Sequence, residues 1–196
     1  MRLHEEELDR VIDFMLTADK LKSTDRTGWV MRRVKNPEHV GDHSFSTALF
    51  SYVVARRMGI DAGKCMTMAL IHDIAEARIG DIATREKEED QTVSNAEKQK
   101  MESKAMGEIL SLLDKDVASE FGALWEELEA GRSEEAKLVK QMDKLDYVLM
   151  LVEYSKYMND GELNEFLATA GSRISIPEVR RIYDRIKRDL AKSRKK

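Results

Sequence analysis

Apolar residues recur at helical spacing along almost the whole chain. The first stripe, near the N-terminus, consists of Leu8, Val11, Ile12, Met15 and Leu16. This spacing places all five on one side of a helix. A second stripe consists of Phe45, Ala48, Leu49, Tyr52 and Val53. It ends at Met58-Gly59, where the glycine is a suitable C-terminal cap. The pattern predicts an all-α fold.

The segment after Gly59 is apolar on most of its circumference. Asp61 is a suitable N-cap for a helix that we expect to include residues 62–77, AGKCMTMALIHDIAEA, and to end before Gly80. We expect this to be the central, most buried helix. It nonetheless carries His72, Asp73 and Glu76, and burying three ionisable groups is costly unless something compensates them. In a helix all three can face one cavity.

The rest of the chain is also predicted to be helical. Residues 84–104 begin as a polar stretch, which we interpret as a solvated loop leading into a helix near residue 95. The alternative is a mobile flap over a pocket. Further helices are expected around Ala105–Leu113 and Asp116–Ala130, from an N-cap at Ser133 to a turn at Asp160-Gly161, and over residues 177–192. With no repeat, linker or break in composition, we predict one domain over residues 1–196, with its core at about 5–190 and a basic tail at 191–196.

Composition supports this interpretation and narrows the function. The 196 residues include only 2 prolines and 10 glycines, and 36% are charged, which favours long helices with a highly charged surface. A net charge of −4 argues against a nucleic-acid surface as the main function. The single cysteine, Cys65, cannot form an internal disulfide. No apolar run is long enough to span a membrane and no signal-peptide pattern is present. We therefore expect a cytoplasmic protein.

The histidines and aspartates suggest a metal site. His43 opens the second apolar stripe, and Asp143 in KLVKQMDKLDYVLM lies on or beside the apolar face of its helix. The His72-Asp73 pair could instead be a hydrogen-bonded structural pair, and Asp143 could pair with a neighbouring lysine. Two histidines and two aspartates from three helices would otherwise form a mixed nitrogen and oxygen site for a divalent cation such as Mn, Co, Fe, Zn or Mg.

The order His43, His72-Asp73, Asp143 resembles that of the HD-domain superfamily of metal-dependent phosphohydrolases. The segments TGWVMRRVKNPEHVGDHS, ALIHDIAEARIGDI, SEEAKLVKQMDKLD and ISIPEV resemble the 5′-deoxynucleotidase group within it. This resemblance covers roughly residues 5 to 190. It implies an all-α fold, dependence on a divalent metal and hydrolysis of deoxynucleoside 5′-monophosphates to deoxynucleoside and phosphate. It also implies a homodimer or higher homo-oligomer.

The resemblance assigns roles to particular residues. Glu76 would orient or deprotonate the attacking water. Asp81 would accept a hydrogen bond from the sugar 3′-hydroxyl, although it could simply be a helix cap. Trp29 would lie along the sugar, a role compatible with a place in the core. The metal ligands would be His43, His72, Asp73 and Asp143.

One position departs from the pattern. Bacterial members of the group carry a phosphate-binding arginine immediately before the tryptophan, and here that position is Gly28. Arg32, Arg33 and Lys87 are the alternatives that we consider for the phosphate. The departure bears on substrate preference more than on reaction class.

The sequence leaves other functions open. A related phosphohydrolase could act on a nucleoside triphosphate, a cyclic nucleotide or an alarmone. No histidine follows His72, which disfavours a two-metal site and favours a mononuclear one. A metal-stabilised scaffold without activity would leave Glu76 and Asp81 without a role.

Overall fold

The computed structural model describes residues 4–83 and 93–194, and this part of the chain is helical. An isolated bridge joins Asp25 to His39. The all-α prediction is confirmed. The elements are α1 (Glu5–Asp19), η1 (Lys20–Ser23), α2 (Thr27–Val30), α3 (Val40–Met58), α4 (Ala62–Ile71), α5 (Glu76–Ile79), α6 (Asn95–Leu110), α7 (Lys115–Ala130), α8 (Glu134–Tyr154), η3 (Ser155–Tyr157), α9 (Asp160–Ser172) and α10 (Pro177–Ser193).

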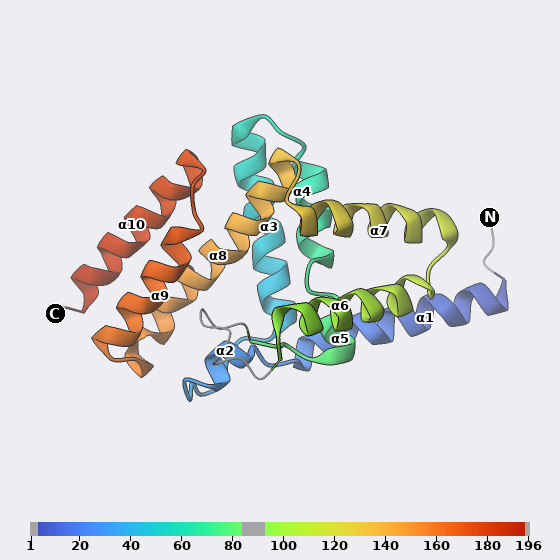
Figure 1. Cartoon of the computed structure of the whole chain (residues 1–196), viewed down its shortest axis with the longest axis horizontal. Helices are drawn as coiled ribbons and strands as arrows, with labels where there is room; N and C mark the ends of the chain where they lie inside the picture. The colour runs from blue at the N-terminus through green and yellow to red at the C-terminus, as the bar shows by residue number, and fades with distance from the viewer. Residues whose placement is uncertain (1–3, 84–92, 195–196) are drawn as a thin grey trace.

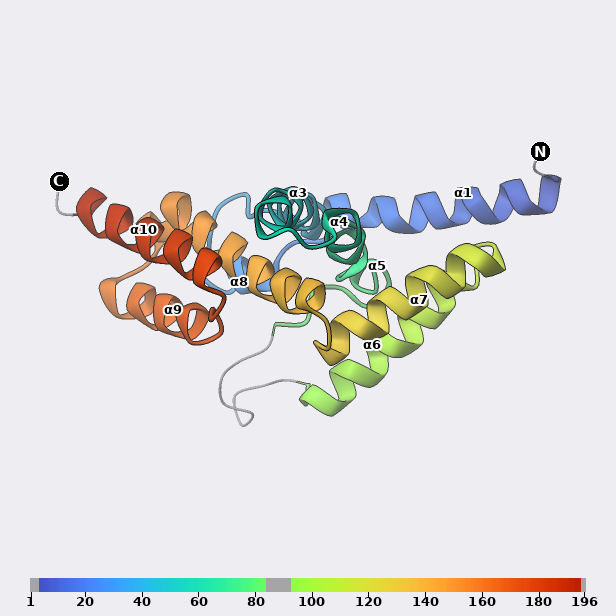
Figure 2. The ribbon, with the colours of Figure 1, turned by 90° about the horizontal axis from the view of Figure 1, so that it is seen from above.

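Helices α3, α4 and α8 form the middle of the molecule (Figure 1). Helices α9 and α10 pack against α8 at one end, and α1, α6 and α7 extend toward the other end (Figure 2). None of the helices in the described part of the chain combines the length and apolar character needed to cross a bilayer.

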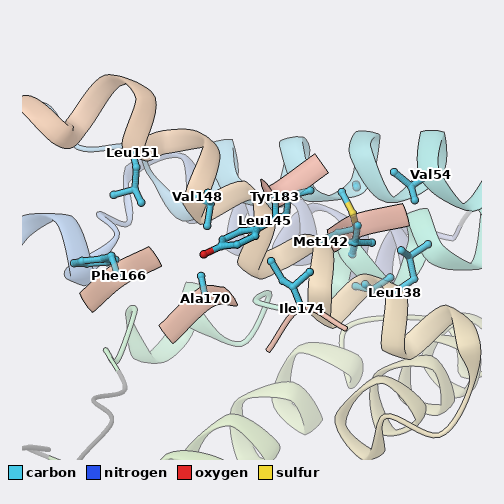
Figure 3. Close-up of a cluster of buried hydrophobic side chains, with 14 of the residues drawn as sticks. Val54, Leu138, Met142, Leu145, Val148, Leu151, Phe166, Ala170, Ile174 and Tyr183 are labelled. Carbon is cyan, nitrogen blue, oxygen red and sulfur yellow. The ribbon is translucent and has the colours of Figure 1, made fainter. Parts of the chain in front are cut away.

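Helix α8 is the centre of the larger apolar core. Several of its side chains are at most 1% exposed, among them Leu138, Met142, Leu145, Val148 and Leu151. Figure 3 shows them as a row, with Phe166, Ala170, Ile174 and Tyr183 from α9, α10 and the segment between them on the same side. We expected the helix after Asp61 to hold this central place. Instead α4 is exposed on one side, at Met66 and Leu70.

The caps predicted from the sequence are confirmed. Gly59 ends α3 with φ of 76°, a conformation that costs glycine little. The Asp61 carboxylate accepts a hydrogen bond from the Lys64 backbone N–H at 2.9 Å, and Ser133 Oγ accepts one from the Ala136 N–H at 3.1 Å. These two caps fix the starts of α4 and α8, which contact each other in the middle of the molecule.

Two expected boundaries are wrong. The helix that begins near residue 95 continues to Leu110, so the separate helix expected around Ala105–Leu113 is the second half of α6. Asp160-Gly161 is the first turn of α9 rather than a turn between helices, because Asn159 accepts the Glu162 N–H at 3.0 Å and caps it. The alternative of a flap falls largely on residues 84–92, outside the described residues.

Candidate metal centre and active site

His43 is oriented by a buried carboxylate. It lies in the second turn of α3 and is 0% exposed. Its Nδ1 is 2.7 Å from Asp146 Oδ2 on α8. Because the ionised carboxylate only accepts, Nδ1 donates this bond, and the lone pair of Nε2 faces the opposite way.

His72 and Asp73 lie where helix α4 ends. We expected a continuous helix over residues 62–77, and this is wrong: α4 stops at Ile71 and α5 starts at Glu76. Between them the backbone tightens, with the Glu76 N–H bonded to the Asp73 carbonyl at 3.0 Å. His72 Nδ1 donates to the Ala69 carbonyl at 2.6 Å, the group that would accept the Asp73 N–H in a continuous α-helix. The imidazole thus takes part in ending the helix.

The four expected metal ligands come together from α3, α8 and this turn. The two Nε2 atoms of His43 and His72 are 3.2 Å apart. Asp73 Oδ2 lies 3.1 Å from His72 Nε2 and 3.8 Å from His43 Nε2. Asp143 Oδ1 is 3.3 Å from His43 Nε2. The potential ligand atoms of His43, His72 and Asp73 all lie within 4.8 Å of one another.

The chemistry of this donor set fits a divalent cation. Each imidazole uses Nδ1 for a hydrogen bond that points outward, so each Nε2 atom is left facing the shared centre. Histidine ligands in metal sites are commonly held in this way by a carboxylate or a backbone carbonyl. Two imidazole nitrogens and two carboxylates suit a mixed nitrogen and oxygen site.

The interactions around the centre raise the pKa of His43 and lower the pKa of Asp73, and both shifts favour the charged forms. Although burial and the Arg26 charge lower it, hydrogen bonds to Asp143 and Asp146 raise the pKa of His43 to about 9. Burial raises the pKa of Asp73, but the charges of His72 and Arg26 hold it below its usual range.

Glu76 is a buried carboxyl group with spare capacity for hydrogen bonding. It is 4% exposed, and its Oε2 has no partner among the residues described. Burial, together with the charges of Asp73 and Asp81, raises the pKa of Glu76 to about 10. A divalent cation close by would favour the ionised form. An unsatisfied buried oxygen is expensive, so its presence beside the candidate ligands points to a role in the site.

These residues open into one cavity of about 670 Å³. Much of its wall comes from α6, α7 and α8. The expectation that His72, Asp73 and Glu76 can face one cavity is confirmed, because all three line it. Four of the candidate residues line it: His72, Asp73, Glu76 and Asp143. Cationic side chains line it as well: Lys98, Lys137, Lys140, Lys144 and Arg173. The cavity thus combines an acidic centre with a basic wall.

Sequence reasoning missed two functional residues. Asp146, which holds His43, follows Asp143 by three positions on the same face of α8, and that spacing could have identified it. Arg26 lies three positions before Trp29, and its Nη1 is 3.2 Å from Asp73 Oδ2 with the side chain 12% exposed. The family pattern drew attention only to the position immediately before the tryptophan.

Asp81 ties the candidate site to α2. Its Oδ2 accepts the Thr27 backbone N–H at 2.8 Å, and the Thr27 hydroxyl donates to the Asp81 carbonyl at 2.6 Å. Asp81 therefore acts as a cap, the alternative that we allowed, but it caps α2, far earlier in the chain, and not a helix after Gly80. Its Oδ1 accepts no hydrogen bond from the described residues.

Trp29 lies in the core. It is 0% exposed, its indole N–H donates to Glu38 Oε1 at 2.8 Å, and its ring stacks on Tyr147 with centroids 4.2 Å apart. Phe166 stacks on the same indole at 5.8 Å. The core role that we allowed for Trp29 is confirmed.

The arginines that we considered for the phosphate do not line the cavity. Arg32 lies over the Phe166 ring at 3.8 Å and donates to the Gly28 carbonyl. Arg33 is exposed in a turn at φ of 57°. Lys87 lies outside the described residues.

Comparisons with known proteins match most of the chain. The HD domain family model matches residues 18–180. The protein named 5′-deoxynucleotidase HDDC2 from zebrafish is 38% identical over 173 residues, which cover 88% of this chain and 84% of that protein. Its human namesake is 35% identical, covering 86% and 80%.

A solved structure shares the architecture. The crystal structure of the PH0347 protein from Pyrococcus horikoshii superposes with a TM-score of 0.70 at 31% identity, covering 90% of this chain and 98% of that one. With the family model, the curated relatives and the structural match in agreement over nearly the same residues, this chain belongs to the HD-domain family.

Proposed function

We propose that this protein is a metal-dependent 5′-deoxynucleotidase that hydrolyses deoxynucleoside 5′-monophosphates to deoxynucleoside and phosphate. The observation that carries the proposal is the group of His43, His72 and Asp73, together with the unpartnered Oε2 of Glu76, which lines the same cavity as His72 and Asp73. The curated relatives with this domain are named for this activity.

The proposed cofactor is one divalent cation from the set Mn, Co, Fe, Zn and Mg. His43, His72, Asp73 and Asp143 would hold it, and four protein ligands leave room for water or a phosphate oxygen. When bound, the cation neutralises charge on the phosphate ester and lowers the pKa of water. No further histidine lies near the group among the described residues that could complete a second site of this kind.

The chain's own residues supply the remaining functions. Glu76 has the buried, unpartnered oxygen needed to orient the attacking water and accept its proton. Asp81 has Oδ1 available to accept a hydrogen bond from the sugar 3′-hydroxyl while Oδ2 holds Thr27. The backbone of α2 fixes that carboxylate in place.

The phosphate needs a cation in place of the arginine that is absent at Gly28. We assign this role to Arg26, because its guanidinium lies 3.2 Å from the candidate ligand Asp73 and has further N–H donors to offer. Arg26 contacts the cavity only through Asp73, whereas Lys98, 19% exposed, and Lys144, 2.8 Å from Asp143 Oδ2, line it directly and are further cations for the phosphate.

The test measures phosphate release from a panel of deoxynucleoside and ribonucleoside 5′-monophosphates. The protein is stripped with EDTA, and each cation is then added back. We expect metal-dependent turnover of the deoxynucleotides, and a loss of at least about 10²-fold in Glu76→Gln with bound metal retained. Turnover of only tri-, cyclic or alarmone nucleotides would favour the alternative hydrolase. No turnover of any nucleotide would favour the metal-stabilised scaffold.

We also propose a homodimer or higher homo-oligomer. Helix α3 buries three hydroxyl side chains and exposes four large apolar ones. The buried residues are Ser44, Thr47 and Ser51, and the exposed ones are Phe45, Leu49, Tyr52 and Val53. Helix α1 likewise exposes Leu8, Ile12, Met15 and Leu16. Apolar stripes this large mark a surface that another molecule covers, and a second copy is the proposed occupant. Sedimentation equilibrium tests this, and Phe45→Glu with Leu49→Glu is expected to give a monomer.

We place the protein in the cytoplasm, with nucleotides as its ligands rather than nucleic acid or membrane. The one cysteine, Cys65, is buried and free, as suits a reducing compartment. Fractionation of expressing cells tests this placement.

A further inference from the structure

Tyr147 covers part of Trp29. Its ring stacks on the indole with centroids 4.2 Å apart and planes inclined by 18°. Trp29 itself has no exposed surface, whereas Tyr147 is half-buried. Phe166 also stacks on the Tyr147 ring, with centroids 5.1 Å apart, so the aromatic surface that remains for a ligand beside α2 is the exposed part of Tyr147.

The helical register places Tyr147 next to the candidate metal ligands. It follows Asp143 by four residues on α8, so the two side chains share one face of the helix. Asp146, which orients His43, immediately precedes it. The charged groups that act on the Tyr147 hydroxyl are Arg32, Arg26, Asp81 and Glu38.

The hydroxyl lies against Gly28. A Cβ added to this glycine would be 2.9 Å from Tyr147 Oη, too close for an ordinary contact, while the nearest ring carbons would be 3.8 Å away. The residue before Gly28 is Thr27, whose N–H is held by Asp81. The Asp81 carboxylate and the Tyr147 hydroxyl thus approach the same two-residue stretch of α2. The absence of a side chain at position 28 makes room for the hydroxyl.

The Tyr147 hydroxyl can form a hydrogen bond with a ligand. It makes none with the residues that the structure describes, although burial raises the pKa of Tyr147 and keeps the phenol protonated at neutral pH. A partly buried tyrosine hydroxyl normally finds a partner. The neighbouring Tyr154 follows this rule, since its Oη accepts the Glu38 N–H at 3.0 Å.

We propose that Tyr147 contacts the deoxyribose of the substrate and determines how well the sugar is held. Its ring packs on the sugar in place of Trp29, and its hydroxyl bonds to the sugar beside Asp81. This inference rests on the proposed 5′-deoxynucleotidase function and names a residue that binds the nucleoside rather than the phosphate.

The test compares Tyr147→Phe, Gly28→Ala and the double variant. Loss of one hydrogen bond should lower kcat/KM for a deoxynucleoside monophosphate roughly five- to tenfold through KM in Tyr147→Phe. Gly28→Ala should cause a similar loss, because its Cβ displaces the hydroxyl. The double variant should be no worse than Tyr147→Phe, since removal of Oη leaves only the ordinary 3.8 Å contacts.

Two controls separate sugar binding from general damage. Inhibition by inorganic phosphate, which has no sugar, should be unchanged in all three variants. Tyr157→Phe removes a hydroxyl from another half-buried tyrosine and should leave KM unchanged. Equal losses toward phosphate and nucleotide, or an additive double variant, would overturn the proposal.

Calorimetric binding of the same nucleotide to the metal-loaded proteins keeps this inference distinct from the proposed function. If wild type binds the nucleotide without hydrolysing it and Tyr147→Phe binds more weakly, the inference stands and the nucleotidase proposal fails. If wild type hydrolyses it and Tyr147→Phe performs equally well, the inference fails alone. Absence of binding to wild type overturns both.

Discussion

Asp146 shows how one residue outside the ligand set can control a metal site. It is 2% exposed, and its Oδ2 accepts the His43 Nδ1 hydrogen bond at 2.7 Å. The carboxylate fixes the ring orientation and would make Nε2 a better ligand for the proposed metal. Asp146→Asn keeps the shape but replaces the charge with an amide that holds the imidazole less strongly. We expect metal affinity to fall roughly 10- to 100-fold, measured by titration of the stripped protein.

Asp160→Asn is the matched control, because Asp160 is 85% exposed and belongs neither to the candidate metal ligands nor to the lining of the cavity. It should bind metal like wild type. Equal affinity in Asp146→Asn would mean that the bond to His43 does not support the metal. Tyrosine and tryptophan fluorescence measured alongside would show that both variants are folded.

The sequence patterns identified the candidate metal ligands, but they did not identify Arg26 and Asp146, which contact two of these ligands. His72 and Asp73 adjoin in the sequence, and His43 and Asp143 carry the family spacing, so all four were predicted as ligands, and the structure brings them close together. Arg26 and Asp146 were missed because an arginine in a polar segment and an aspartate in a helix are usually solvated. Only the fold reveals that their partners are Asp73 and His43.

At the scale of elements, helix starts were predictable and helix continuity was not. Ser133 and Asp61 are themselves N-caps, and their residue types make them recognisable in the sequence. The end of α4 at Ile71 depends on the His72 ring reaching back to the Ala69 carbonyl, and no propensity signals that bond. Asp160-Gly161 looked like a turn, yet the capping box of Asn159 and Glu162 begins α9 there. The N-cap at Asn159 thus decided the local structure, and the turn preference of Asp160-Gly161 did not.

Gln141 joins α8 to the segment between α9 and α10. Its Oε1 accepts the backbone N–H groups of Ser175 and Ile176, each at 2.8 Å, and its Nε2 donates to Ser175 Oγ. Gln141→Leu would leave two backbone donors without this partner, and we expect it to lower the free energy of unfolding by about 2–3 kcal/mol. Urea denaturation monitored by circular dichroism measures the loss.

The exposed Lys137 on the same helix offers the control. Lys137→Leu introduces the same side chain but removes no hydrogen bond that the Lys137 side chain makes within the described part of the chain, so it should change stability by less than about 0.5 kcal/mol. A similar loss in both variants would assign the effect to leucine rather than to the Gln141 contacts.

At the scale of the whole molecule, the candidate ligands link parts that are far apart in the sequence. His43 comes from α3, His72 and Asp73 from the turn after α4, and Asp143 from α8. These are the elements that meet in the middle of the molecule (Figure 1). Composition and periodicity could indicate a helical domain, but they could not show that α8 rather than α4 is its centre, since both helices carry long apolar runs.

Removal of the metal should therefore destabilise the whole fold and not only the site. A cation that binds the folded chain alone stabilises it by about 2.7 kcal/mol at a concentration about 100 times its Kd. For a chain of this length that corresponds to a rise in Tm of roughly 5–10 °C, measured by calorimetry before and after the cation is added back. Asp143→Asn removes the ligand contributed by α8 and should lose most of this rise, whereas Asp160→Asn should retain it. If both variants respond to the cation like wild type, α8 is not joined to α3 through the metal.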